Sequence, residues 1–217
     1  MKIISLSSTI AGPACAIATI IKKKFYNDNY KTNIFDYLEI SFDSIIEILE
    51  IKNNIDFDRK IKENYEIILN KTGKNSVYFK NFNKIISHHD LITNHTEVDF
   101  EDFINKYKRR YDRLFNTINE ENKIFFIRFG IEEKDKIEKF INEVNKINKE
   151  LIVYFINVYY DDKCNCLYEI DNYYPINFFN YIDYNKKYND DPFYKTLEFN
   201  WDYIFDIIKN NLSESNN

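Results

Sequence analysis

The stretch 123–159 reads KIFFIRFGIEEKDKIEKFINEVNKINKELIVYFINVY, and it carries the clearest fold signal in the chain. Residues 123–129 and 151–159 are short apolar runs, which is the pattern of strands buried on both faces. Between them, Gly130 is followed by a charged amphipathic segment that predicts a helix over 131–148. Strand, helix and strand in this order favour two parallel neighbours joined by a crossover helix.

Both ends of the chain extend this pattern. Residues 2–7 are rich in strand formers and stop at a polar loop over 8–14, after which an apolar helix is expected to begin at Cys15. Towards the other end, residues 166–170 predict a strand that forms an edge hairpin with 151–159. Residues 172–198 are aromatic and irregular, and a last helix is expected to start near Asn200.

The middle of the chain predicts two helices and a hairpin. The Ser41 hydroxyl is placed to cap a helix that continues to residue 49 on an apolar face. The short apolar runs 77–80 and 84–87 predict a hairpin. A helix capped by Asp99 follows, because apolar side chains then recur at three- and four-residue steps as far as Phe115.

Together these elements predict the α/β class, with a mixed, largely parallel sheet and helices on both faces. The chain has 217 residues, of which 44% are hydrophobic, enough apolar surface for a core that needs no disulfide or metal. The absence of a linker-like stretch predicts one domain over 1–212 and a disordered tail over 213–217.

The net charge of -5 argues against nucleic acid and anionic membranes as partners, because an acidic surface attracts neither. The densest basic segment, 106–113, is interpreted as the solvated face of a helix. Cys164 and Cys166 are too close in sequence to bridge without strain, which favours a reducing compartment. The apolar N-terminal stretch is interrupted at Gly12 and Pro13 and is shorter than a secretory core, so a cytoplasmic location is expected.

Chemistry is concentrated at Cys15 and at the cluster His88, His89 and Asp90. A thiol at a helix start is stabilised as a thiolate by backbone N–H groups and by the helix dipole. A buried, inert cysteine is the competing interpretation, since free cysteine commonly acts as a small hydrophobe. A nucleophilic cysteine needs an imidazole base, and adjacent residues of a strand face opposite ways, so one of the two histidines would serve.

Other kinds of site find less support. Two adjacent histidines and one aspartate lack a recognisable ligand spacing, so no metal site is predicted. The first loop has neither the GxGxxG nor the Walker A pattern, so no cofactor is predicted either.

The order of these motifs is similar to that of the DUF1796 family of papain-like cysteine peptidases. The similarity spans most of residues 3–130. It is carried by Ser-Leu-Ser at 5–7, Cys15, Ile-Phe-Asp-Tyr at 34–37, Ser41, Ser-His-His-Asp at 87–90, Tyr-Lys-Arg-Arg-Tyr-Asp-Arg-Leu at 107–114 and Phe-Ile-Arg at 126–128. The usual glycine after Ser-Leu is Ser7 here, the proline before Phe-Asp is Ile34, and the tryptophan after it is Tyr37.

The resemblance implies a papain-like thiol hydrolase or peptidase that acts on a peptide or protein. It implies Cys15 as nucleophile and the His88–His89 pair as the source of the base, with Asp36 as an acidic site residue; Asp90 is the other candidate orienting group. Members occur in bacteria and in large DNA viruses, and a viral source is favoured. A catalytically inactive module that binds a host protein through the aromatic segment 172–199 is the alternative.

The arginines leave two interpretations open. Arg109, Arg110 and Arg128, with Arg113 nearby, are candidates for binding a substrate carboxylate or phosphate through paired hydrogen bonds. The alternative is that they hold a helix and a strand together through buried ion pairs with Asp36 or Asp90.

Overall fold

The apolar run 123–129 forms β6 (Lys123–Phe129), in which every residue is buried. The computed structural model describes residues 2–26, 29–69, 75–88, 97–160, 168–173, 178–183 and 201–213. β7 (Ile152–Tyr160) lies parallel to β6, with Ile124 opposite Val153, and α5 (Lys134–Ile147) connects them. The strand, helix and strand predicted over 123–159 are confirmed.

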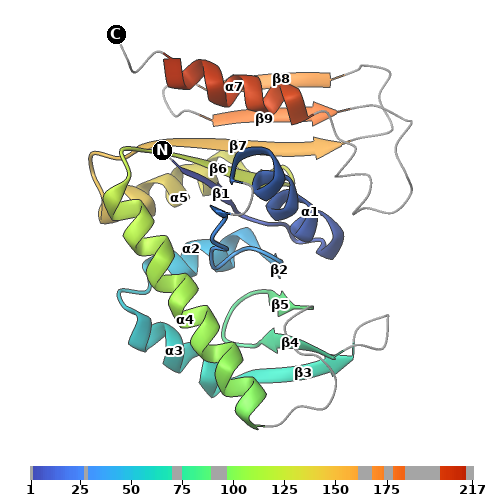
Figure 1. The fold of residues 1–217 in the computed structure, drawn as a ribbon, viewed down its shortest axis with the longest axis vertical. Helices are drawn as coiled ribbons and strands as arrows, with labels where there is room; N and C mark the ends of the chain where they lie inside the picture. The colour runs from blue at the N-terminus through green and yellow to red at the C-terminus, as the bar shows by residue number, and fades with distance from the viewer. Residues whose placement is uncertain are drawn as a thin grey trace.

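A five-stranded sheet is built around this unit in the order β1-β6-β7-β9-β8 (Figure 1). β1 (Lys2–Ser5), β6, β7 and β9 (Phe178–Asp183) run parallel, and β8 (Tyr168–Tyr173) is antiparallel to β9. The predicted hairpin between 151–159 and 166–170 is therefore wrong, because β9 lies between β7 and β8. β9 itself falls in the segment 172–198 that was expected to be irregular.

A second sheet is antiparallel throughout, in the order β2-β5-β4-β3. Its strands are β2 (Leu38–Ile40), β3 (Tyr65–Leu69), β4 (Asn75–Phe79) and β5 (Ile85–Ser87). The hairpin predicted from the runs 77–80 and 84–87 is confirmed as β4 and β5. The mixed α/β class is confirmed, but one largely parallel sheet is not, since almost half of the assigned strands belong to this antiparallel sheet.

Residues 6–8 join the two sheets. The Leu6 N–H donates to the carbonyl of Ile127 at 2.8 Å, and the Phe129 N–H donates to Ser7 at 3.1 Å. On the other side, the Ile40 N–H donates to the carbonyl of Ser8 at 2.8 Å, and Ser8 forms a parallel bridge with Glu39. The segment therefore hydrogen-bonds to the large sheet with one edge and to the small sheet with the other.

Helices cover both faces, as predicted. α1 (Ala11–Ile21), the π-helix η1 (Lys22–Tyr26) and α7 (Trp201–Ser213) pack on one face through a core cluster that includes Ile3 and Phe125. α2 (Phe42–Glu50), α3 (Asn54–Glu63), α4 (Glu97–Glu120) and α5 share the other, larger cluster, which includes Ile4 and Phe126. Figure 1 shows α4 running from the large sheet down past the small one.

Two local features bear on the predictions. The Ser41 side chain caps α2 by accepting from the Ser44 N–H, as expected from the sequence. No helix within the described ranges is long and apolar enough to cross a membrane.

Candidate functional site

Cys15 is the fifth residue of α1, which begins at Ala11 after the N-cap Ile10. The expectation that the helix starts at Cys15 is wrong by one turn. Pro13 lies in the first helical turn and not in a loop, because a proline is tolerated there, where its missing N–H would have no helical acceptor. Cys15 therefore lies beyond the first four N–H groups, the ones free to stabilise an anion.

Cys15 lies on the partly exposed edge of α1. Gly12, Cys15 and Thr19 are half-buried at three- and four-residue spacing, whereas the residues between Cys15 and Thr19 are buried. Tyr37 lies beside this edge and forms a hydrogen bond with Thr19. Burial raises the pKa of the Tyr37 phenol, and electrostatic interactions with Asp36 and Cys15 raise it further, whereas the hydrogen bond with Thr19 lowers it. Because Tyr37 immediately precedes β2, Cys15 lies near the beginning of that strand.

His88 follows β5 and is held by two side chains. Its Nε2 lies 2.9 Å from Oε2 of Glu39 on β2, and its Nδ1 lies 3.0 Å from the Ser76 hydroxyl on β4. The side chains of His88 and Glu39 are 17% and 15% exposed, so solvent reaches the pair only in part. Glu39 also forms an ion pair with Lys84, whose ammonium donates to the Thr9 carbonyl at 3.2 Å.

The Glu39 carboxylate stays charged despite its environment. Burial acts to raise its pKa, but hydrogen bonds from His88 and Lys84 outweigh burial and hold the pKa below its usual range. A carboxylate of this kind fixes the orientation and tautomer of a neighbouring imidazole.

Strand register places this group on the same face as α1. Leu38, Ile40 and Val77 belong to the core cluster shared with α2 to α5. Because successive side chains of a strand alternate between faces, Glu39 on β2 points to the opposite face, the one that continues the face of the large sheet on which α1 packs. Glu39, with His88 bonded to it, and α1 therefore lie on the same side of the joined sheets.

Asp36 is not the partner of His88. Its fully buried carboxylate accepts from the Tyr30 hydroxyl at 2.6 Å, from the Asn33 N–H at 2.8 Å and from the Asn33 side-chain amide at 2.9 Å. Burial raises its pKa to about 6, although these hydrogen bonds and the charge of Arg110 act to lower it. Asp36 thus organises the turn before β2, and the expectation that it orients the histidine does not fit its contacts.

His89 and Asp90 lie outside the described residues. Most of the aromatic segment 172–199 lies outside them too. Glu39 is the residue that sequence reasoning missed. The alternation Leu-Glu-Ile at 38–40 was the available signal, because it places a single carboxylate on the outer face of a strand that is otherwise buried.

Arg128 is buried, and its guanidinium bonds to groups of the protein itself. It is fully buried, and its guanidinium donates to Glu132 at 2.8 Å and to the carbonyls of Leu6 at 2.8 Å and Ile40 at 3.0 Å. It therefore ties β6 to the ends of β1 and β2. The expectation that Arg128 contacts a substrate does not fit this position, and the alternative of a buried structural arginine does, with Glu132 in place of Asp36 or Asp90.

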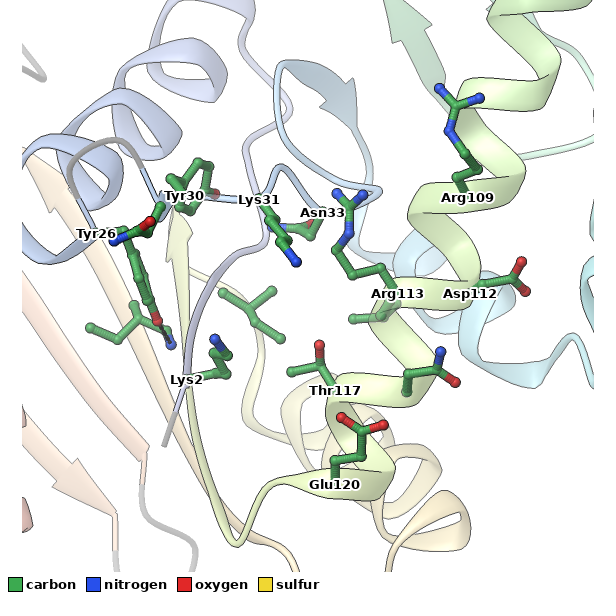
Figure 2. A pocket seen from close by; sticks show the side chains of 15 residues that line it. Lys2, Tyr26, Tyr30, Lys31, Asn33, Arg109, Asp112, Arg113, Thr117 and Glu120 are labelled. Atoms are coloured by element: carbon green, nitrogen blue, oxygen red, sulfur yellow. Dashed lines mark hydrogen bonds between the residues drawn. The ribbon is translucent and has the colours of Figure 1, made fainter.

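The other arginines lie along α4 beside two cavities. Arg109 and Arg113 line a cavity of about 530 Å³ between α4 and residues 29–33, together with Lys2 and Lys31 (Figure 2). The same two arginines, with Arg110, also line a smaller pocket of about 190 Å³. The arginines on α4 are thus separated from Arg128, contrary to the single grouping expected from the sequence.

A family model described as "Putative papain-like cysteine peptidase (DUF1796)" matches residues 2–157. The chain belongs to this DUF1796 family. No curated protein and no solved structure matches the chain. The DUF1796 region contains Cys15, Glu39 and His88, and it ends within β7, so β8, β9 and α7 lie outside it.

Proposed function

We propose that this DUF1796 protein is a thiol hydrolase that cleaves an amide bond in a peptide or protein. Cys15 is the nucleophile, and the base comes from the His88–His89 pair. The observation that carries the proposal is the Glu39–His88 pair, because it supplies a carboxylate-oriented imidazole on the side of the joined sheets on which α1, the helix of Cys15, packs.

The chemistry assigns a step to each group. The imidazole takes the proton of the Cys15 thiol, and the thiolate sulfur attacks the carbonyl carbon of the scissile amide. The imidazolium then gives its proton to the leaving amine as the carbon–nitrogen bond breaks, which leaves a thioester. Water, deprotonated by the same imidazole, attacks the thioester and releases the carboxylic acid and the thiol.

His88 is the base that the contacts favour. Its Nε2 is held by the Glu39 carboxylate, so the proposal assigns proton transfer to Nδ1, whose partner is a neutral hydroxyl. Ser76 bonds to that nitrogen at 3.0 Å, and its hydroxyl would turn away or relay the proton when Cys15 engages the ring. Glu39 acts as a positioning residue, since it acts through His88.

Selective alkylation tests the proposal directly. Iodoacetamide modifies the thiolate form of cysteine, so we expect Cys15 to react faster than Cys164 and Cys166 near neutral pH. His88→Gln should slow the modification of Cys15 about tenfold or more, as expected when the base of a nucleophilic cysteine is removed. Peptide mapping by mass spectrometry reads each cysteine separately, and the two other cysteines serve as internal references.

His89→Gln is the matched control for His88→Gln. If His89→Gln slows the reaction of Cys15 and His88→Gln does not, His89 is the base and the assignment to His88 is wrong. Equal reactivity of all three cysteines in the wild type would contradict the thiol mechanism altogether.

Glu39→Gln separates positioning from folding. Glutamine keeps the size of the side chain and removes the charge that favours the imidazolium. With a fluorogenic peptide that the wild type cleaves and Cys15→Ala does not, we expect Glu39→Gln to lower kcat about tenfold or more and to leave KM unchanged. A rise in KM at constant kcat would show that Glu39 contributes to binding rather than to orienting His88.

One observation favours the inactive interaction module as a second candidate. Cys15 lies in the second turn of α1, beyond the N–H groups that lower the pKa of a thiol at a helix start. This candidate predicts slow, unselective alkylation of Cys15, the opposite of the result expected above.

A further inference from the structure

Four cationic side chains of α4 converge on one small pocket. Lys106, Arg109, Arg110 and Arg113, together with Thr32, line a volume of about 190 Å³, named here the arginine pocket. They recur at three- and four-residue steps, which places them on one side of the helix. We propose that the arginine pocket binds the phosphate group of a small phosphorylated ligand.

The three guanidinium groups of the arginine pocket form few bonds with protein acceptors. Among the described residues, no carboxylate forms an ion pair with Arg109, Arg110 or Arg113. Arg110 is 8% exposed, and its Nη1 atom is buried with no hydrogen-bond partner. Buried polar nitrogens are almost always hydrogen-bonded in proteins, so the unused donor of Arg110 indicates an acceptor supplied by a ligand.

The neighbours of the three arginines leave this conclusion intact. Arg113 donates to the Thr32 carbonyl, which uses one nitrogen of its guanidinium. Arg110 stacks over Tyr107 at 5.2 Å and lowers the pKa of the buried Asp36 through its charge, without a hydrogen bond between them. Asp36 is itself occupied by Tyr30 and Asn33.

A larger cavity continues from the arginine pocket. Arg109 and Arg113 line both cavities. The larger one, of about 530 Å³, is also lined by Lys2, Lys31 and the side chains of Tyr26 and Tyr30. Figure 2 shows Lys31 and Arg113 on facing sides of it. A volume of this size suits the organic part of a small ligand, since ligand cavities commonly measure about 300–1,000 Å³.

The acidic residues of the larger cavity lie away from the arginines or are already bonded. Asp112 accepts two hydrogen bonds from Asn54, at 2.9 and 3.0 Å, and Figure 2 shows Glu120 at the opposite end of the cavity from Arg109. The end that carries the arginines is therefore the anion-binding end.

Charge favours a phosphate over a single carboxylate. Three guanidinium groups and one ammonium face the same small volume, and guanidinium forks match the oxygens of a phosphate in pairs. The whole chain has a net charge of -5, so this concentration of positive charge is local.

Calorimetry on the full chain tests the proposal, with inorganic pyrophosphate as the probe. We expect saturable binding at one site, weakened about tenfold or more by Arg109→Gln, the effect of losing one charge-assisted hydrogen bond. Arg109 is exposed, so this variant keeps the fold. Arg59→Gln is the matched control, because Arg59 is an exposed arginine on α3 whose partners are Asp56 and Glu63.

Each remaining outcome decides the proposal. Absence of saturable binding, or equal weakening by Arg109→Gln and Arg59→Gln, would overturn it. Malonate binding more tightly than pyrophosphate would assign the pocket to carboxylates instead. If ADP binds more tightly than pyrophosphate, the larger cavity holds the organic group of the ligand. If ADP binds no more tightly, the assignment of the larger cavity to an organic group is wrong. Cys15→Ala should bind pyrophosphate as the wild type does, so this test is independent of the proposed hydrolase.

Discussion

Replacing Arg128 with methionine removes the side chain that ties β6 to both neighbouring segments. The carbonyls of Leu6 and Ile40 lose this donor, and the Glu132 carboxylate loses its charged partner. Removing one partner of a buried, hydrogen-bonded ion pair costs about 3–5 kcal/mol, although a well-packed apolar replacement of the whole pair can be neutral. Here the partners stay behind, so we expect the free energy of unfolding to fall by about 3–5 kcal/mol.

Denaturant unfolding followed by circular dichroism measures this loss. A domain of this size should also melt about 6–20 °C lower, since each kcal/mol shifts Tm by about 2–4 °C. Arg59→Met is the matched control, and we expect it to change stability by less than about 1 kcal/mol because its ion pairs are exposed. If Arg128→Met fails to fold, Arg128→Lys keeps the charge with fewer donors and should lose about half as much. A loss below about 1 kcal/mol for Arg128→Met would refute the structural role.

Three further predictions concern the joining segment and the turn before β2. Ser7 has a φ of 57°, where a side chain is strained, so Ser7→Gly should be more stable than Ser7→Ala by about 1 kcal/mol in denaturant titrations. Both variants lose the hydroxyl that donates to Leu38, so equal stabilities would contradict backbone strain at this position. Folding raises the pKa of Asp36 from 3.8 to about 6, so the folded protein holds this proton to higher pH than the unfolded chain does. The contribution of Asp36 to stability should therefore fall as pH rises from about 4 to about 6, and the difference in unfolding free energy between wild type and Asp36→Asn should follow it. Tyr30→Phe removes a hydrogen bond to the same carboxylate and should raise the pKa of Asp36 further, which NMR titration of the carboxyl carbon would detect; a lower pKa would contradict the assigned cause.

The parts of the fold that could be predicted from sequence are those with an unambiguous burial pattern. β6 and α5 were recognisable because a strand buried on both faces and a helix buried on one have different periods. β9 was not recognisable, since its place between β7 and β8 depends on pairing between distant segments. β3 was missed for a related reason: as the edge of the small sheet it exposes Tyr65, Ile67 and Leu69, so burial imposes no alternation on it.

The residues of the candidate site also differ in how far the sequence alone could predict them. Cys15 and His88 were recognisable as scarce, reactive residue types at the ends of predicted elements. The sequence marks Glu39 only as a single carboxylate between Leu38 and Ile40, because its contact with His88 depends on the pairing of β2 with β5, which brings it to a histidine 49 positions later. Asp36 was assigned to the site by resemblance, and its hydrogen bonds to Tyr30 and Asn33 show that it organises the turn before β2.

The segment 6–8 makes the fold and the candidate site depend on one another. Ser8 forms a parallel β-bridge with Glu39, and α1, which carries Cys15, begins three residues after Ser8. Arg128 donates to the carbonyls of Leu6 and Ile40, so the same buried guanidinium braces the segment that leads to α1 and the end of β2, the strand of Glu39. A papain-like site needs its thiol and imidazole within hydrogen-bond reach, and small displacements at such a site reduce rates strongly. The strain at Ser7 lies in this junction too, at the position where the family usually has a glycine. The joining of the two sheets is therefore the structural feature that brings the helix of Cys15 and the Glu39–His88 pair to the same end of β2.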